Sequence, residues 1–236
     1  MKNFFLKYLN KLILYYNDRI KLKLQPKSPS DLYLEQVSRE CLEFFKEEFK
    51  GAFIFSDDRS IREFAISKAI ENFKKEELFL EFGVFKGDSI NLFAKNLNKI
   101  NTKIYGFDSF KGLKNNWITE KFNPAGTFNL NSKIPKVSKN VQLINGWVED
   151  TLEEFLDKNK NSINFVHMDL DTYESTSLVL KNIKKRLVSG SVVLFDEFYG
   201  FPNWEKYEYK AFIENFSKNE YKYIAFSNRQ ACIKIL

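Results

Sequence analysis

The feature that most constrains the fold is a regular alternation of short apolar runs with longer amphipathic segments, which begins at Leu78. The apolar runs have the length of buried strands, and the amphipathic segments repeat their apolar residues at helical spacing. Strands that alternate with helices predict a mostly parallel sheet joined by right-handed crossovers. We expect strands at Leu78–Glu81, Lys103–Phe107, Val141–Ile144, Ile163–Met168, Ser191–Phe195, Tyr221–Phe226 and Ala231–Ile235, and helices at Ser89–Leu97, Leu152–Asn159, Ser175–Leu187 and Lys206–Ser217.

The last two expected strands are separated only by the short turn Ser227-Asn228-Arg229, which predicts an antiparallel hairpin at one edge of the sheet. The chain is therefore expected to be an α/β protein with a seven-stranded, mostly parallel sheet, one antiparallel edge strand and helices on both faces. Two further helices are expected at Asp31–Lys50 and Asp57–Lys75. We accordingly place an N-terminal helical arm at residues 1–56 and the α/β domain at residues 57–236.

The net charge of +6 is concentrated at the N-terminus. The first thirty residues contain seven basic side chains and one acidic one, whereas the rest of the chain holds thirty of each. A nucleic-acid-binding domain needs a basic surface interleaved with groups that read bases, so nucleic acid is not an expected partner. The basic helix candidate Phe4–Leu24 can contact a second subunit of a homo-oligomer, lie on an anionic membrane surface or pack on its own domain.

The sequence also bears on the cellular compartment. Cys41 and Cys232 stand alone, without the spacing of a metal site or a disulfide framework. The apolar residues near the N-terminus are interrupted by charges, and no small-residue cleavage site follows them. No apolar run approaches the ~18 residues of a membrane span. We therefore expect a cytoplasmic protein.

Carboxylates follow two of the expected strands directly. The segment FVHMDLDTYEST brings Asp169 and Asp171 to the end of one strand, and FDEF brings Asp196 and Glu197 to the end of another. The carboxyl ends of strands in an open α/β sheet line the ligand crevice. Up to four carboxylates at one edge suit a hard divalent cation. The alternative is that these acids only cap helices and bond to the backbone.

The only histidine lies two residues before Asp169, on the same expected strand. Side chains two residues apart on a strand point to the same side, so His167 can face the same crevice as Asp169 and act there as a general base. A histidine embedded in the core of the sheet is the other interpretation.

Three more strand ends predict a nucleotide-like ligand. After the first strand, LEFGVFKGDS places Glu81, Gly83 and Gly87 in a turn where the backbone can approach a ligand closely, although the spacing departs from GxGxxG. The second strand ends at Asp108, whose carboxylate can bind ribose hydroxyls or cap the next turn. After the third strand, the aromatic ring of Trp147 can face an adenine or pack in the core.

These motifs occur in a recognisable order. The series LEFGVFKGDSI, YGFDSFKGL, INGWVEDTL, FVHMDLDTYEST and GSVVLFDEF, followed by PNWEKYEYKAF, resembles the S-adenosylmethionine-dependent class I methyltransferases of the macrocin O-methyltransferase (TylF/MycF-like) family. The likeness runs from about Ile61 to the C-terminus. It implies the Rossmann-like class I methyltransferase fold and methyl transfer from S-adenosylmethionine to a hydroxyl of a small-molecule acceptor, namely a sugar, a nucleotide sugar or a glycan precursor.

The resemblance also implies roles for individual residues. The methionine end of the cofactor would be held by Glu81, Gly83, Gly87 and Ser89, its ribose by Asp108, and its adenine by the segment with Gly146, Trp147 and Asp150. Mg²⁺ would be bound by Asp169, Asp196 and Glu197, with Asp171 as a neighbouring or alternative ligand. Asp169 and His167 are the catalytic candidates. The chain departs from the family at Asp88 and Leu170, where the family has small residues or cysteine.

Two other functions remain open at this point. A catalytically idle relative that binds a partner through its basic arm predicts a damaged cofactor site. A nicotinamide-dependent sugar-modifying enzyme predicts a GxGxxG turn, which the sequence lacks. The long connection Ser109–Asn140 is expected to help cover the active site, because long loops in compact domains are usually functional or mobile.

Overall fold

The computed structural model describes residues 9, 11–15, 27–71 and 73–236. Contacts divide the chain into two compact units, Met1–Gln36 and Val37–Leu236, so the division falls earlier than the predicted boundary after residue 56, which stays a prediction. In the first unit, residues 11–15 are helical and helix α2 (Pro29–Phe44) begins. Most of the predicted basic helix Phe4–Leu24 lies outside the described residues, and so do the membrane and subunit contacts predicted for it.

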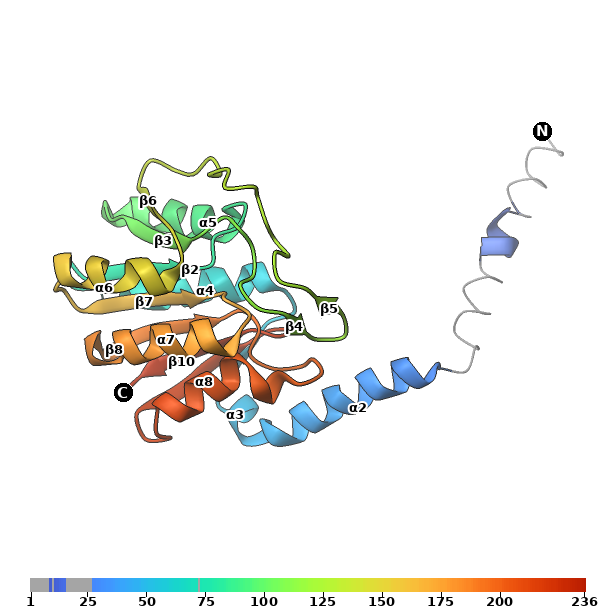
Figure 1. The fold of residues 1–236 in the computed structure, drawn as a ribbon. Coiled ribbons are helices and arrows are strands. Elements are labelled where there is room, and N and C mark those ends of the chain that lie inside the picture. Colours follow the sequence, from blue (N-terminus) through green and yellow to red (C-terminus); the bar gives the residue numbers. More distant parts are fainter. Residues whose placement is uncertain (1–8, 10, 16–26, 72) are drawn as a thin grey trace. The chain divides into compact units, whose positions relative to one another are not determined.

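The second unit is built on a sheet of eight strands in the order β1-β9-β10-β8-β7-β2-β3-β6 (Figure 1). Neighbouring strands are parallel, except that β10 is antiparallel to both β8 and β9. The strands are β1 (Phe53–Ile54), β2 (Leu78–Phe82), β3 (Ile104–Asp108), β6 (Val141–Asn145), β7 (Ile163–Met168), β8 (Leu187–Phe195), β9 (Tyr221–Phe226) and β10 (Ala231–Ile235).

This arrangement confirms the predicted α/β fold with its mostly parallel sheet and antiparallel strand. The sheet has one strand more than predicted, because β1 pairs with β9 at the edge. A two-residue strand carries no periodic pattern that a sequence can reveal. The predicted hairpin is present, and β10 lies between β9 and β8.

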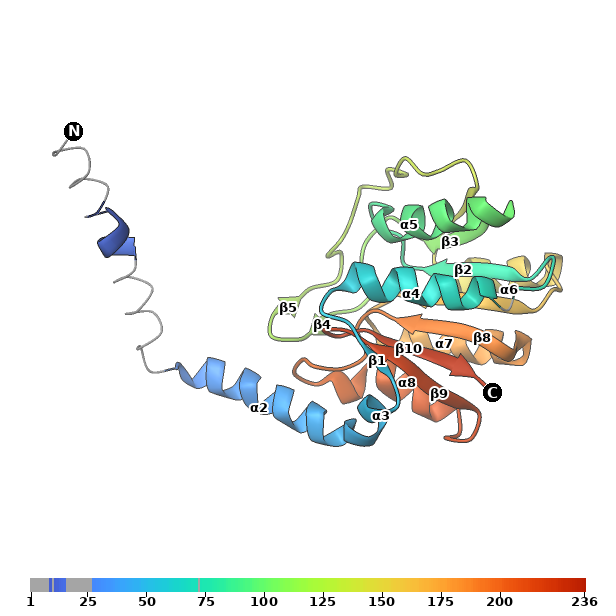
Figure 2. The ribbon, with the colours of Figure 1, turned by 180° about the vertical axis from the view of Figure 1, so that it is seen from behind.

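Helices cover both faces of the sheet (Figures 1 and 2). Helices α4 (Asp58–Glu71) and α5 (Asp88–Leu97) lie on one face, and α6 (Val148–Lys158), α7 (Tyr173–Ile183) and α8 (Glu208–Asn215) lie on the other. The short elements are α3 (Lys46–Lys50), η1 (Asn98–Ile100), η2 (Lys184–Arg186) and η3 (Trp204–Lys206). The predicted helix at Asp31–Lys50 is thus broken in two at Phe45.

Each face of the sheet has its own apolar core. Strands β2 and β7 are buried at every position, which is why they read as continuous apolar runs. Three polar residues interrupt these runs: Glu81 in β2, and Asn164 and His167 in β7. Glu81 and His167 have no exposed surface. Acidic side chains and histidine are seldom fully buried without a partner, so these positions lead to the polar network described below.

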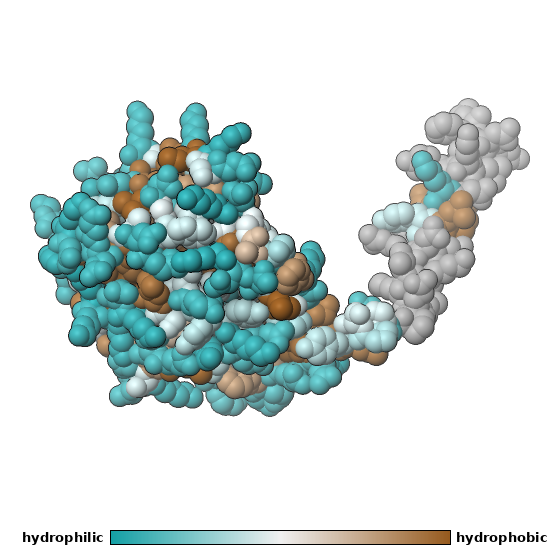
Figure 3. All heavy atoms as spheres, in the orientation of Figure 1, coloured by the Kyte–Doolittle hydropathy of each residue, from teal (hydrophilic) through white to brown (hydrophobic). Residues whose placement is uncertain are grey.

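The connection from residue 109 to residue 140 carries a small hairpin of β4 (Trp117–Ile118) and β5 (Phe122–Asn123). The Tyr207 hydroxyl holds this hairpin, since it donates to the carbonyl oxygen of Ile118 at 3.0 Å and accepts from its amide at 3.1 Å. Hydrophilic residues dominate the visible face of the larger unit (Figure 3). Among the helices that the structure describes, none combines the length and apolar character needed to cross a bilayer.

Candidate active site

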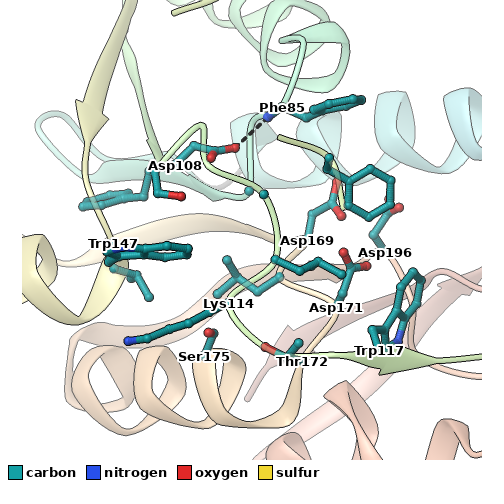
Figure 4. Close-up of a pocket in the computed structure, with 18 of the residues that line it drawn as sticks. Phe85, Asp108, Lys114, Trp117, Trp147, Asp169, Asp171, Thr172, Ser175 and Asp196 are labelled. Carbon is teal, nitrogen blue, oxygen red and sulfur yellow. Dashed lines mark hydrogen bonds between the residues drawn. The ribbon is translucent and has the colours of Figure 1, made fainter. Parts of the chain in front are cut away.

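A cleft of about 290 Å³ opens at the carboxyl ends of the parallel strands. Its wall contains seven of the predicted site residues: Gly83, Asp108, Gly146, Trp147, Asp169, Asp196 and Glu197. The connection that follows β3 contributes Lys114, Trp117 and Phe128, so it forms part of the wall as expected. Figure 4 shows Asp108 and Trp147 at one end of the cleft and the acidic side chains at the other.

Gly83 is required by the protein's own backbone. Its φ of 89° lies in the left-handed region, and a Cβ atom on it would lie 1.8 Å from the carbonyl oxygen of Asp169. The glycine therefore lets the end of β2 pass directly against the end of β7. Gly87, with a φ of 87°, precedes α5 and does not line the cleft.

Glu81 and Ser89 lie outside the cleft wall. The Ser89 hydroxyl donates to Glu81 Oε1 at 2.6 Å, and both side chains are buried. Glu81 Oε2 lies 3.7 Å from Nδ1 of His167. The structure therefore joins these two residues to the histidine, whereas the sequence placed them at the methionine end of the cofactor.

Asp108 orders the turns beside the cleft. Its Oδ2 accepts hydrogen bonds from the amides of Val84 at 2.9 Å and Phe85 at 2.7 Å, and its Oδ1 accepts from the amide of Phe110 at 2.6 Å (Figure 4). Phe85 and Phe110 both have left-handed backbones, with φ values of 48° and 54°. The carboxylate thus stabilises two costly turns and also faces the cleft.

The end of the cleft near Trp147 contains an ion pair that sequence reasoning missed. Lys114 Nζ lies 2.7 Å from Glu149 Oε1 and 5.6 Å from the centre of the Trp147 ring. Glu149 lines the cleft, whereas the predicted Asp150 does not. Helix α6 begins at Val148, four residues before the predicted start. In this helix, Glu149 faces the cleft and Asp150 does not.

The other end of the cleft gathers acids from β7 and β8. One ligand atom from each of His167, Asp169 and Asp196 lies within 4.8 Å of the others. His167 does not line the cleft, and its Nε2 lies 3.3 Å from Asp196 Oδ1. Burial lowers the pKa of His167, but its hydrogen bonds to Asp196 and Glu81 outweigh burial and raise it above the ordinary value.

The pKa values of two carboxyl groups in this cluster, Asp196 and Asp169, are shifted in opposite directions. Asp196 is partly buried, and burial would raise its pKa, but His167 and Arg62 stabilise its charge and lower the pKa to about 2. Arg62, in α4, donates to Asp196 Oδ1 at 2.6 Å, and the side-chain amide of Gln230 donates to the same oxygen through Nε2. By contrast, burial and the negative charges of Asp196 and Asp171 raise the pKa of Asp169 well above its usual range.

Asp171 and Glu197 are also easier to protonate than ordinary acids. Burial and the charge of Asp196 raise the pKa of Asp171 to about 7, and its φ of 61° is unusual for a residue other than glycine. Burial and Asp196 raise the pKa of Glu197 to about 8, although Arg229, whose Nη1 lies 3.4 Å from Glu197 Oε2, opposes this. Backbone strain and raised pKa values together are typical of functional sites.

The donor set fits a divalent cation. Asp169 and Asp171 repel their acidic neighbours, and within the described residues neither has an ion-pair partner. A hard cation prefers carboxylate oxygens and would remove this repulsion. The atoms that converge most closely come from His167, Asp169 and Asp196, and Glu197 is not among them.

Around the acids at the ends of β7 and β8, four residues were not predicted: Arg62, Glu208, Arg229 and Gln230. Arg62 is 134 positions from Asp196 in the chain, and no sequence pattern links the two. Glu208 lies in PNWEKYEYKAF, a segment that carried the family resemblance, so a signal for it was present. Its side chain has no exposed surface, and burial and Asp171 raise its pKa well above the ordinary value.

Comparisons with known proteins were made for both sequence and structure. Residues 80–198 match the family model described as a methyltransferase domain. No curated protein matches the sequence. The structure is similar to CalS11, a calicheamicin methyltransferase, with a TM-score of 0.62 and 20% identity over 89% of this chain and 94% of that one. A second, apo structure of CalS11, a TDP-rhamnose 3'-O-methyltransferase, gives a TM-score of 0.56, with 20% identity over 89% of this chain and 96% of that one.

Two further solved structures have the same fold. The O-methyltransferase NovP gives a TM-score of 0.57, with 17% identity over 87% of this chain and 99% of that one. An O-methyltransferase from Bacillus cereus in complex with SAH gives a TM-score of 0.50, with 12% identity over 93% of this chain and 97% of that one. At these identities the similarity is one of fold.

Proposed function

This chain belongs to the family of methyltransferase domains, and from that premise we propose that it is an S-adenosylmethionine-dependent O-methyltransferase, of the macrocin type, that acts on a sugar hydroxyl. The acceptor is a sugar, a nucleotide sugar or a glycan precursor. One observation carries the proposal: a single cleft has a carboxylate and an indole at one end and a group of acids at the other. The sugar class is supported by CalS11, whose acceptor is TDP-rhamnose.

The end with Asp108 and Trp147 suits the nucleoside of the donor. A carboxylate can accept hydrogen bonds from ribose hydroxyls, and an indole ring can pack against adenine. The sulfonium group would then lie between this end and the acids near Gly83. This order of groups along one cleft directs the methyl group toward an acceptor bound beside Asp169 and Asp171.

The reaction is an in-line displacement at carbon. The acceptor oxygen forms a bond to the methyl carbon, the bond from carbon to sulfur breaks, and its electron pair stays on sulfur. The hydroxyl proton must leave, and Asp169 is the better acceptor for it, because Asp169 lines the cleft whereas Oδ1 of Asp196 is already engaged by Arg62, His167 and Gln230. We assign Asp169 this role.

Asp169, Asp196 and Glu197 would hold Mg²⁺, with Asp171 as an alternative ligand. When bound, Mg²⁺ lowers the pKa of a hydroxyl group and orients it. His167 has no exposed surface and faces Glu81 and Asp196, so its role is to hold Asp196 in place. We further propose a cytoplasmic location and, through the N-terminal helices, a homo-oligomer.

Calorimetric titration with S-adenosylhomocysteine, with and without Mg²⁺, tests the cofactor assignment. We expect binding in both cases. Transfer of a labelled methyl group from S-adenosylmethionine to a panel of nucleotide sugars and methyl glycosides then tests the reaction. If S-adenosylhomocysteine does not bind, the proposed function is wrong. If it binds but no sugar in the panel accepts the methyl group, the sugar class is wrong.

A further inference from the structure

We propose that Glu208 is a positioning residue for the acidic end of the cleft, where it holds the turn Asp196–Glu197 through the backbone amide of Glu197. This inference rests on the proposed function, because that function gives the two acids of the turn a role. Glu208 is the first residue of α8 and does not line the cleft.

The contact is direct. The amide of Glu197 donates a hydrogen bond to Glu208 Oε2 at 3.1 Å. The Glu208 side chain has no exposed surface, and glutamate is almost never buried to this extent without a specific partner. Its other oxygen, Oε1, is buried and has no hydrogen-bond partner within the described part of the chain.

Glu208 is not buried as half of an ion pair. The charged groups that interact with it most strongly include Asp169, Asp171, Asp196 and Glu197, all of them acids. The structure describes no salt bridge to its carboxyl group. The hydrogen bond from the Glu197 amide is therefore the interaction that explains why a carboxyl group is placed here.

The backbone of the turn shows what this bond does. Three consecutive amides are satisfied by three different elements. The amide of Asp196 donates to the carbonyl oxygen of Met168 in β7 at 2.9 Å, and the amide of Phe198 donates to the carbonyl oxygen of Arg229 at 2.8 Å. Only the middle amide, that of Glu197, depends on a side chain. Loss of this acceptor would leave that amide unpaired and free the turn that carries both acids.

The two variants Glu208→Gln and Glu208→Leu separate hydrogen bonding from charge. Glutamine keeps a carbonyl oxygen that can accept from the Glu197 amide, whereas leucine has a similar size and no acceptor. Glu205→Leu, at an exposed position of the same segment, is the control for a change of charge.

Two measurements apply to the wild type and to each variant. The first is hydrogen exchange of the Glu197 amide. The second is the affinity for Mg²⁺, titrated into the S-adenosylhomocysteine complex. In Glu208→Leu we expect exchange to be faster by about tenfold or more and Mg²⁺ affinity to fall by about 10–100-fold, with S-adenosylhomocysteine affinity unchanged. In Glu208→Gln and Glu205→Leu we expect all three quantities to stay within about threefold of the wild type.

The proposal is wrong if the amide of Glu197 is equally protected in Glu208→Leu and the wild type. It is also wrong if Glu208→Gln loses protection or Mg²⁺ affinity, because the charge would then be what matters. Should Glu208→Leu fail to fold, Glu208→Ala, which also lacks an acceptor, takes its place with the same expected loss of protection. Failure of the wild type to bind S-adenosylhomocysteine would instead contradict the proposed function.

Discussion

At the scale of single residues, the site shows how neighbours divide roles among identical side chains. Asp169 and Asp196 follow adjacent strands, yet the pKa of one is raised and that of the other falls to about 2. Arg62 and His167 account for the difference, because both stabilise the charge of Asp196. Asp169 therefore binds a proton more readily than Asp196, although the two carboxyl groups lie close together.

Replacing Asp169 by asparagine should lower methyl transfer by about a hundredfold or more, because the acceptor for the hydroxyl proton is lost. Donor affinity should change little, since asparagine has nearly the same shape. Steady-state rates and calorimetry with S-adenosylhomocysteine measure the two effects. Asp157→Asn, on an exposed face of α6, is the matched control. Turnover near the wild-type rate in Asp169→Asn would contradict the role assigned to Asp169.

Gly83→Ala should destabilise the fold by about 3 kcal/mol or more, because the new methyl group would meet the carbonyl oxygen of Asp169 at 1.8 Å. Gly126→Ala is the control, since Gly126 also has a left-handed φ, of 86°, but nothing lies within 4 Å of its added Cβ. That variant should lose only about 1–2 kcal/mol. Urea unfolding measures both, and equal losses would show that the contact at Gly83 has no cost of its own.

At the scale of elements, the site is a product of strand order. Because β7 and β8 are adjacent and parallel, their carboxyl ends meet at the same edge of the sheet. Acids that follow these two strands in sequence must then approach one another in space. This is why the placement of Asp169 beside Asp196 could be predicted from the sequence.

The acids at the ends of β7 and β8 should make the metal-free protein less stable as the pH rises. The pKa of Asp171 is about 7 and that of Glu197 about 8 in the folded state, against ordinary values of 3.8 and 4.5 for these side chains. Between these limits the folded protein binds more protons than the unfolded chain, so stability falls from about pH 5 to pH 8. The depressed pKa of Asp196 acts in the opposite sense, but only below about pH 4.

Urea midpoints at pH 5.5 and pH 8.0, measured in EDTA and in Mg²⁺, test this expectation. A cation that binds the ionised acids should raise stability most at pH 8.0 and so reduce the difference between the two midpoints. Greater stability at pH 8.0 than at pH 5.5 in EDTA would contradict the raised pKa values.

The limits of sequence prediction also follow the elements. The buried parallel strand β7 and the two strands of the hairpin, β9 and β10, were predicted with their observed bounds, because each is a short run rich in apolar residues and the last two flank a tight turn. Helix α6 was predicted to begin at Leu152 but begins at Val148, because Trp147 makes no side-chain cap that would mark the start. Arg62 and Gln230 could not be found, since their contacts with Asp196 depend on how α4 and β10 pack, not on a local pattern.

At the scale of the whole molecule, aromatic packing links the site to distant segments. Phe45, between α2 and α3, has 1% of its surface exposed, and its ring lies 6.1 Å from that of Phe198, 5.5 Å from that of Trp204 and 5.8 Å from that of Phe226. Phe198 directly follows Glu197. The segment before β1 therefore supports the turn that carries the acids.

Phe45→Ala should lower the free energy of unfolding by about 3–5 kcal/mol, the usual cost of removing a buried aromatic ring. Its neighbour Phe44 is the natural control, because 56% of its surface is exposed. Phe44→Ala should cost about 1 kcal/mol. Thermal and urea unfolding give both values. Similar losses in the two variants would mean that Phe45 does not belong to the core.

The position of β10 has a consequence for the order of events during synthesis of the polypeptide. This strand enters between β9 and β8, and the turn just before it delivers Arg229 to Glu197 and Gln230 to Asp196. When the nascent chain has emerged only as far as β8, one edge of β8 has no hydrogen-bonded neighbour. Arg229 and Gln230 are then also missing from the acids that they contact. The acidic end of the cleft is thus complete only after the hairpin docks, and until then the bare edge of β8 is a place where chains can associate wrongly.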